Sequence, residues 1–151
     1  MKYIMYSHCG GDKAIPSKLK QEVENAITGI TVKAISGVAT KIRKQFLDSI
    51  LSAGWSSKVA VSVDSNMTIT SQKNKVGLCL QTGNVSRTYA DLLKLQTLYL
   101  NNSIESAVIV VPSKETALLL GSNIAQYSRL LQEVTIMKKA YTVPTLIFSM
   151  E

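Results

Sequence analysis

Apolar residues recur at helical spacing in two segments of the first third of the chain. In residues 17–28 they return every three or four positions after a proline and before a glycine, which favours an amphipathic helix. The stripe consists of Leu19, Val23, Ala26 and Ile27. A second stripe in residues 38–53 consists of Val38, Ile42, Phe46 and Ile50. The pattern therefore predicts two helices before residue 55.

The spacing of apolar residues changes to two after residue 57. Residues 58–64 alternate between polar and apolar, residues 67–70 are short and extended, and residues 71–74 have the composition of a turn. If residues 75–81 form the next strand, successive side chains face opposite sides of it. One side receives Val76, Leu78 and Leu80, and the other receives Gly77, Cys79 and Gln81. This stretch predicts a strand meander.

The second half of the chain mixes helical and strand patterns. Residues 89–102 are rich in leucine and predict a largely buried helix. The apolar run 107–111 ends at a proline, as expected for a strand covered on both faces. Two further helices are predicted around residues 113–120 and 123–133, and a last strand at residues 142–148. The order of elements predicts an α/β fold with a mixed β-sheet flanked by helices.

Length and composition indicate a single globular domain over residues 1–151. Hydrophobic residues make up 46% of the 151 positions and charged residues 18%, which is typical of a chain that buries a core. No apolar run is long enough to cross a bilayer or to act as a signal peptide. We therefore expect a cytoplasmic, intracellular protein with no membrane partner.

The charge balance points to an anionic partner. Seventeen Lys and Arg residues against ten Asp and Glu residues give a net charge of +7, which favours nucleic acid. The two cysteines, Cys9 and Cys79, show no zinc-ligand spacing. His8 and Cys9 are neighbours on a predicted strand and are expected to face opposite ways, which disfavours a nucleophile pair. Trp55 is expected to fill the core.

Five short segments occur in the order of a known family. They are Tyr6–His8, the helix ending 46–55, the strand segment Cys79–Asn84, the polar segment Gly121–Tyr127 and the closing strand Val143–Ile147. Through these segments the chain resembles the BglII and BstYI type II restriction endonucleases of the PD-(D/E)XK superfamily. The resemblance implies a restriction-endonuclease-like fold, double-stranded DNA as partner and a homodimer.

The resemblance also implies where a catalytic centre would lie. Gln81 matches the family's catalytic glutamine, Cys79 replaces its metal-binding glutamate, and Thr70 replaces the aspartate of the preceding strand. Magnesium prefers carboxylate oxygens, which neither a thiol nor a hydroxyl provides. We therefore expect a degenerate, non-cleaving metal site without a cofactor, and a pocket of Lys73, Lys75, Gln81 and Thr70 that holds a phosphate.

Two alternatives follow from the same residues. An active Mg²⁺-dependent type II endonuclease would need replacement acids, for which Asp64, Glu24 and Glu22 are the candidates, although each is more typical of a solvated element end or helix face. A protein-interaction scaffold would keep the fold without DNA affinity.

The resemblance assigns DNA contacts to two groups of residues. Ser122, Asn123 and Gln126 lie where the family reads bases, and their side chains suit that chemistry, but a polar helix start explains them equally well. Basic residues would contact phosphates, unless they form an ordinary solvated surface. These are Lys41, Arg43, Lys44, Lys73, Lys75, Arg87, Lys138 and Lys139.

Overall fold

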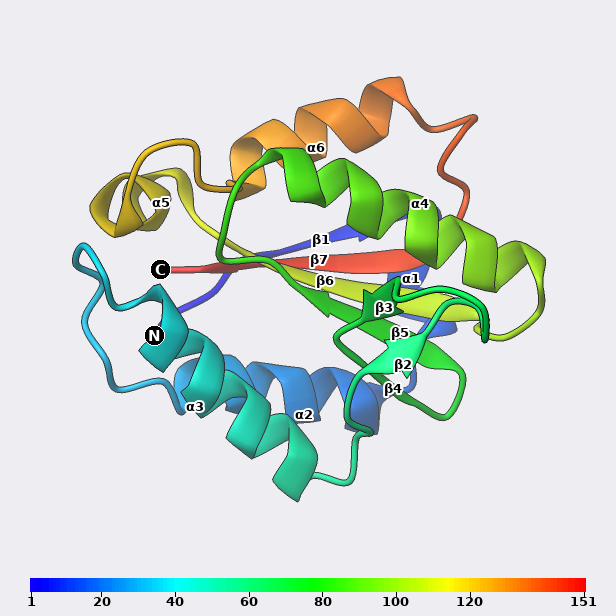
Figure 1. Cartoon of the computed structure of the whole chain (residues 1–151), viewed down its shortest axis with the longest axis horizontal. Coiled ribbons are helices and arrows are strands. Elements are labelled where there is room, and N and C mark those ends of the chain that lie inside the picture. The colour runs from blue at the N-terminus through cyan, green and yellow to red at the C-terminus, as the bar shows by residue number, and fades with distance from the viewer.

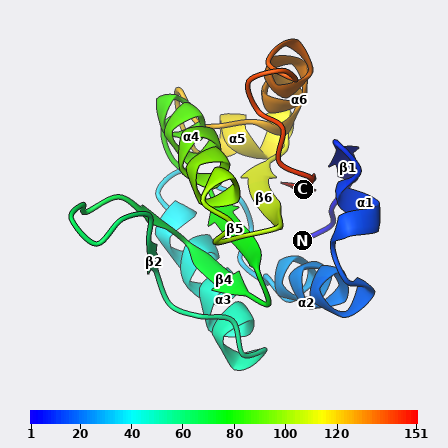
Figure 2. The ribbon, with the colours of Figure 1, turned by 90° about the vertical axis from the view of Figure 1, so that its right-hand side faces the viewer.

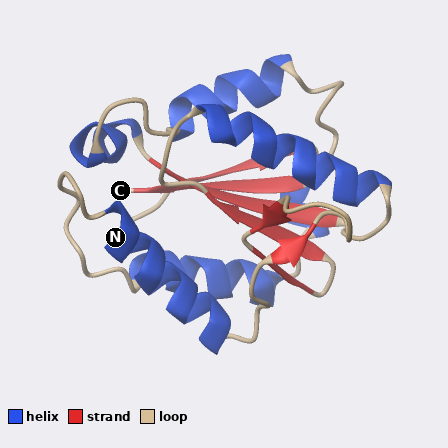
Figure 3. Ribbon diagram, viewed as in Figure 1, coloured by secondary structure: helices blue, strands red, loops and turns tan.

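Alternating side chains on the central strands divide the apolar residues between the two faces of one sheet. The computed structural model describes residues 1–151, and Figures 1 and 3 show this sheet between layers of helices. The spatial order of its strands is β1 (Met5–His8), β7 (Thr145–Met150), β6 (Ser106–Pro112), β5 (Val76–Leu80) and β4 (Ser71–Lys73). Strands β5, β6 and β7 are parallel, whereas β1 and β4 are antiparallel edge strands.

Helices cover both faces of the sheet, and a small hairpin lies beside it. The helices are α1 (Gly11–Ala14), α2 (Ser17–Thr28), α3 (Ala39–Ser52), α4 (Ser86–Leu100), α5 (Lys114–Leu120) and α6 (Tyr127–Ile136). Figure 2 shows α2 and α3 on one face and α4 and α6 on the other. The hairpin pairs β2 (Val59–Ala60) with β3 (Thr68–Ile69). None of the helices has the length and apolar character needed to cross a membrane.

The predicted alternation along residues 75–81 is confirmed. Val76, Leu78 and Leu80 pack with the apolar stripes of α2 and α3 in one core. Cys79 packs in a second core with residues of α4 and α6 on the opposite face. The mixed α/β prediction is therefore confirmed, and so are the helices predicted at residues 17–28 and 38–53. Trp55 is buried, as expected of a core residue.

The predicted meander is wrong in two places. Only Val59 and Ala60 of residues 58–64 form a strand, and Val63 is 96% exposed, because this segment pairs with the short β3 alone. Residues 71–73 form strand β4, and the turn contains only Asn74 and Lys75, at φ 47° and 61°. Two successive left-handed residues suit a tight antiparallel hairpin, so pairing with β5 overrides the polar composition.

Boundaries in the second half shift by several residues. Helix α4 begins at Ser86, and Leu93 and Leu100 on it are 69% and 68% exposed, so the helix is amphipathic instead of largely buried. Helix α6 begins at Tyr127 because residues 121–126 form a loop that pairs with Asn84. The last strand starts at Thr145, after Pro144.

This topology leaves a crevice where the helical layers diverge. Strand β5 leads into α4 on one face, whereas α3 covers the other face at the same end of the strand. In parallel sheets of α/β proteins, ligands bind beyond the carboxyl ends of the strands, where their connections lead to opposite faces. The carboxyl end of β5 is therefore the place to look for a site.

Candidate nucleic-acid site

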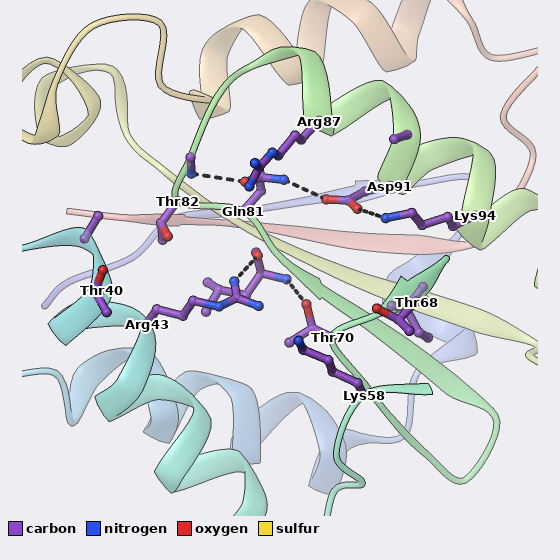
Figure 4. A pocket seen from close by; sticks show the side chains of 15 residues that line it. Thr40, Arg43, Lys58, Thr68, Thr70, Gln81, Thr82, Arg87, Asp91 and Lys94 are labelled. Atoms are coloured by element: carbon purple, nitrogen blue, oxygen red, sulfur yellow. Dashed lines mark hydrogen bonds and ion pairs between the residues drawn. The ribbon is translucent and has the colours of Figure 1, made fainter. Parts of the chain in front are cut away.

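A polar cavity of about 600 Å³ lies at the carboxyl end of β5, between α3 and α4 (Figure 4). Residues from four segments line it: α3, the β2–β3 hairpin, the end of β5, and α4. Its polar and charged side chains come from Thr40, Arg43, Lys58, Thr68, Thr70, Gln81, Thr82, Arg87, Asp91 and Lys94. Four of these are cations and one is a carboxylate, so the cavity has a net charge of +3 when all five are ionised.

Gln81 lies in this cavity, where the resemblance places a catalytic glutamine. Its Nε2 donates to Asp91 Oδ2 at 3.0 Å, and its Oε1 accepts from the backbone N–H of Gly83 at 3.0 Å. Both ends of the amide are therefore engaged within the protein. The side chain is held in one orientation by the loop after β5 and by helix α4.

Asp91 is the one carboxylate that lines the cavity. Burial raises the pKa of its carboxyl group, and the nearby Lys94 ammonium, at 3.2 Å, opposes that rise only in part. Because its pKa is raised, the ionised Asp91 carboxylate lowers the stability of the fold at neutral pH. Each of its two oxygens already accepts a hydrogen bond, one from Gln81 and one from Lys94.

Thr70 and Cys79 occupy the positions where the resemblance expects acids. Thr70 lines the cavity, and its Oγ1 accepts from the backbone N–H of Leu80 at 3.0 Å. Cys79 does not line the cavity, because its side chain is 1% exposed and belongs to the core beneath α4. Burial, together with the charge of Asp91, raises the pKa of the Cys79 thiol and keeps it protonated.

The residues present do not fit a magnesium ion. No group of three His, Cys, Asp or Glu side chains comes together anywhere in the chain, and the cavity is lined by four cations and a single carboxylate. Magnesium is bound in proteins by carboxylates that are free to coordinate it. The cavity therefore offers no set of free carboxylate ligands for a magnesium ion.

The predicted phosphate pocket is only half formed. Gln81 and Thr70 line the cavity, but Lys73 and Lys75 do not. The Lys73 ammonium lies 2.8 Å from both carboxylate oxygens of Glu22 and 2.6 Å from the carbonyl oxygen of Ala53. Lys75 pairs with Glu105 at 3.0 Å. The hairpin turn directs both lysines away from the carboxyl end of β5, because Lys73 and Lys75 lie at the other end of that strand.

The candidate replacement acids also lie outside the cavity. Asp64 is an exposed residue of the turn between β2 and β3. Glu22 is bound by Lys73 and by Trp55 Nε1 at 2.8 Å, and Glu24 lies 3.9 Å from Lys20. None of them can share a ligand with Gln81 in this arrangement.

The three candidate base-reading residues come together in a neighbouring loop. Ser122, Asn123 and Gln126 line a second cavity of about 180 Å³ beside Lys114 and Arg129. Ser122 and Asn123 precede α6 and do not cap it, whereas Gln126 is the N-cap residue of the helix but forms no side-chain capping hydrogen bond. Asn123 adopts φ 54°, a left-handed conformation that asparagine tolerates.

This loop is bonded directly to the rim of the first cavity. The backbone N–H of Val85 donates to Asn123 O at 2.8 Å, and the N–H of Ala125 donates to Gly83 O at 2.9 Å. The candidate base-reading loop and the cavity rim thus form one surface.

Some of the other basic residues line the cavity, and the rest lie outside it. Arg43 and Arg87 line the cavity, as do Lys58 and Lys94, which the sequence analysis did not select. Lys41 and Lys44 are exposed on α3, and Lys44 pairs with Asp48 at 2.6 Å. Lys138 and Lys139 precede β7 and lie near the amino ends of the parallel strands, at the opposite edge from the cavity.

Cys9 and His8 are closer than their expected strand positions allow. Cys9 follows β1 at φ 48°, and its Sγ lies 3.3 Å from His8 Nε2. The same Nε2 lies 2.9 Å from the carbonyl oxygen of Tyr141, which can only accept a hydrogen bond. The histidine nitrogen therefore carries a proton and cannot act as a base toward the thiol, so a structural role is the better interpretation.

Sequence reasoning missed Asp91, although a signal was present. Asp91 lies on the same stripe of α4 as Thr88, Leu95 and Leu98, all buried. A carboxylate on an apolar stripe indicates a buried polar contact or a site. Lys58 and Lys94 gave no comparable signal.

The fold is that of a known class of nucleases. The crystal structure of restriction endonuclease BglII complexed with a DNA 16-mer matches 99% of this chain and 76% of its own, with TM-score 0.84 and 12% sequence identity. The crystal structure of free BglII matches 100% of this chain and 80% of its own, with TM-score 0.79 and 12% identity. These likenesses define a restriction-endonuclease-like fold.

A family model described as "Restriction endonuclease BglII/BglIII" matches residues 3–150. The chain therefore belongs to this family of restriction endonucleases, and the resemblance found in the sequence is confirmed. No curated protein matches the chain.

Proposed function

We propose that this protein binds double-stranded DNA and does not cleave it by the metal-dependent reaction of its family. The observation that supports the proposal is the charge of the cavity at the carboxyl end of β5, which is lined by four cations and by one carboxylate that is paired with Lys94. Such a cavity attracts a polyanion but offers no ligand set for a dication. Related BglII was crystallised with DNA, which supports DNA as the partner. The work of the protein would then be to occupy DNA sites.

The first test measures DNA affinity over a series of salt concentrations, with EDTA and with Mg²⁺ or Mn²⁺, followed by gel analysis of plasmid. We expect the logarithm of the association constant to fall linearly with the logarithm of the salt concentration. We also expect the plasmid to stay intact under all conditions. Absence of affinity at low salt would favour an interaction scaffold instead. Metal-dependent double-strand cleavage at defined sites would contradict the non-cleaving assignment.

Asp91 supports a second candidate function, an endonuclease that uses an atypical acid. It is the only cavity carboxylate, and it contacts Gln81, which matches the family's glutamine. In that account Asp91→Asn abolishes cleavage. This acid replaces the earlier candidates Asp64 and Glu24, which lie elsewhere.

The non-cleaving account makes the opposite prediction for Asp91→Asn. We expect DNA affinity to rise, because the substitution removes the one negative charge from the cavity. We also expect no loss of stability at pH 7, because the raised pKa means that ionised Asp91 costs folding free energy above its folded-state pKa. That cost vanishes as the pH falls below the unfolded-state pKa, so denaturant curves of the variant and the parent should converge in acid. Lower DNA affinity of the variant would count against this account.

The homodimer implied by the resemblance stays a proposal. Its support is the exposed apolar side chains of α4 and α6, which include Leu93, Leu100 and Ile136. Light scattering of the free protein and of its DNA complex checks it, and a monomer in both would contradict it.

A further inference from the structure

Three cations of the cavity have no carboxylate partner. Arg43, Lys58 and Arg87 take part in none of the six ion pairs of the chain, whereas the fourth cation, Lys94, pairs with Asp91. Figure 4 shows Arg43 reaching the cavity from α3 and Arg87 reaching it from α4, on opposite sides of the end of β5. Cations that gather without partners repel one another, which favours an anion between them.

Arg43 is positioned for such an anion by the backbone. Its Nη1 donates to the carbonyl oxygen of Leu80 at 2.8 Å, and its remaining N–H groups form no hydrogen bond within the chain. The planar guanidinium thus has one edge fixed at the end of β5. Arginine in a fixed orientation suits the paired oxygens of a phosphate group, because its N–H donors form a rigid fork.

The start of α3 adds positive potential at the same place. Ala39 and Thr40, the first two residues of this helix, line the cavity. Their backbone N–H groups donate to no group of the protein, and no side chain caps the helix. Unpaired N–H groups and the helix dipole both favour negative charge at a helix start, and here they supplement the three side chains.

We propose that this cavity binds a phosphate group directly through Arg43, Arg87 and Lys58, with no bridging metal ion. The inference rests on the proposed DNA binding and names the part of DNA that the cavity takes. The phosphate belongs either to the continuous backbone or to a strand end, since both present anionic non-bridging oxygens to the arginine donors. A cavity of about 600 Å³ is large enough for a phosphate together with its attached sugar.

The test compares two double variants of equal charge change. Lys58→Gln/Arg87→Gln removes two exposed cations from the cavity, and Lys13→Gln/Lys18→Gln removes two exposed cations from α1 and the first turn of α2, neither of which lines the cavity. Affinity for a short duplex is measured in EDTA over a series of salt concentrations. We expect the cavity variant to lose roughly tenfold or more in affinity and to bind with a shallower salt dependence, while the control changes less than about twofold.

Two further experiments distinguish a phosphate at a strand end from a phosphate of the continuous backbone. The duplex is prepared with 5′-phosphate or with 5′-hydroxyl ends, and closed circular DNA is added as competitor. Tighter binding of the 5′-phosphate duplex assigns the cavity to a strand end. Equal binding of both duplexes together with effective competition by circles assigns it to the backbone. Either result supports the inference, provided that the same binding is lost in the cavity variant.

Failure of the inference is distinguishable from failure of DNA binding. If the parent binds DNA and the two double variants weaken binding equally, the cavity site is overturned while DNA binding stands. If the parent does not bind DNA, inorganic pyrophosphate in EDTA is titrated into the parent and the cavity variant. If the parent binds pyrophosphate and the cavity variant does not, the cavity is a phosphate site. If neither protein binds pyrophosphate, the inference is overturned.

Discussion

Cys79→Glu should destabilise the protein strongly instead of restoring a catalytic centre. The side chain at this position is 1% exposed and packs in the core under α4, with Asp91 nearby. A carboxylate introduced there would be desolvated and repelled by Asp91, and both effects raise its pKa. We expect the free energy of unfolding at pH 7 to fall about 3 kcal/mol below that of Cys79→Gln.

The Cys79→Gln variant is the matched control because it has the same size without the charge. The introduced carboxyl has a folded-state pKa above its unfolded value, so its cost is complete at neutral pH and declines as the pH falls. Denaturant unfolding of both variants between pH 7 and pH 4 checks this. Equal stability at pH 7 would show that position 79 reaches the cavity and would reopen the case for a metal ligand there.

Glu22→Ala should be the second large loss. The Glu22 carboxylate binds Lys73 and Trp55 Nε1, each at 2.8 Å, and the paired Glu22 and Lys73 side chains are 14% and 18% exposed. Removing it leaves an indole N–H and an ammonium without their partner in a largely desolvated place. We expect the free energy of unfolding to fall by about 2 kcal/mol, discounted for the remaining solvent contact.

The pH dependence of this pair has a defined sign. Burial alone would raise the pKa of Glu22, but hydrogen bonds from Lys73 and Trp55 outweigh it and lower the pKa overall. The stabilisation is therefore present at neutral pH and is lost as the pH falls through the lowered folded-state value. Asp48→Ala, which breaks the exposed pair with Lys44, is the control and should change stability by less than about 0.5 kcal/mol. Similar losses in both variants would contradict this account of Lys73.

Elements with local signals were predictable from the sequence. Helices α2 and α3 have an apolar stripe and a terminating glycine, and strand β5 has large apolar residues at every second position, Val76, Leu78 and Leu80. Strand β4 was not predictable, because Ser71, Gln72 and Lys73 have no strand preference of their own and extend only through pairing with β5. In residues 58–64 the alternation predicted too long a strand, because only Val59 and Ala60 pair with another strand, the short β3.

The candidate site was predictable in position but not in composition. The predicted strand puts Gln81 on the same side as Cys79, and in the structure its Nε2 donates to Asp91 of α4. The catalytic position that the resemblance implies for Gln81 stays a prediction. The cavity's cations come from α3, α4 and the β2–β3 hairpin, segments brought together only by the tertiary fold. Lys73 and Lys75 are close to Gln81 in the sequence, but the hairpin turn places them at the other end of β5.

The central claim is that protein cations, and no metal ion, face the DNA at the end of β5. Titration of Mn²⁺ into the protein bound to a duplex, followed by the electron paramagnetic resonance of free Mn²⁺, tests it most directly. The account predicts that the complex takes up no more Mn²⁺ than the duplex alone, in the parent and in Asp91→Asn alike. One Mn²⁺ ion bound per protein chain in the parent, and lost in Asp91→Asn, would contradict it.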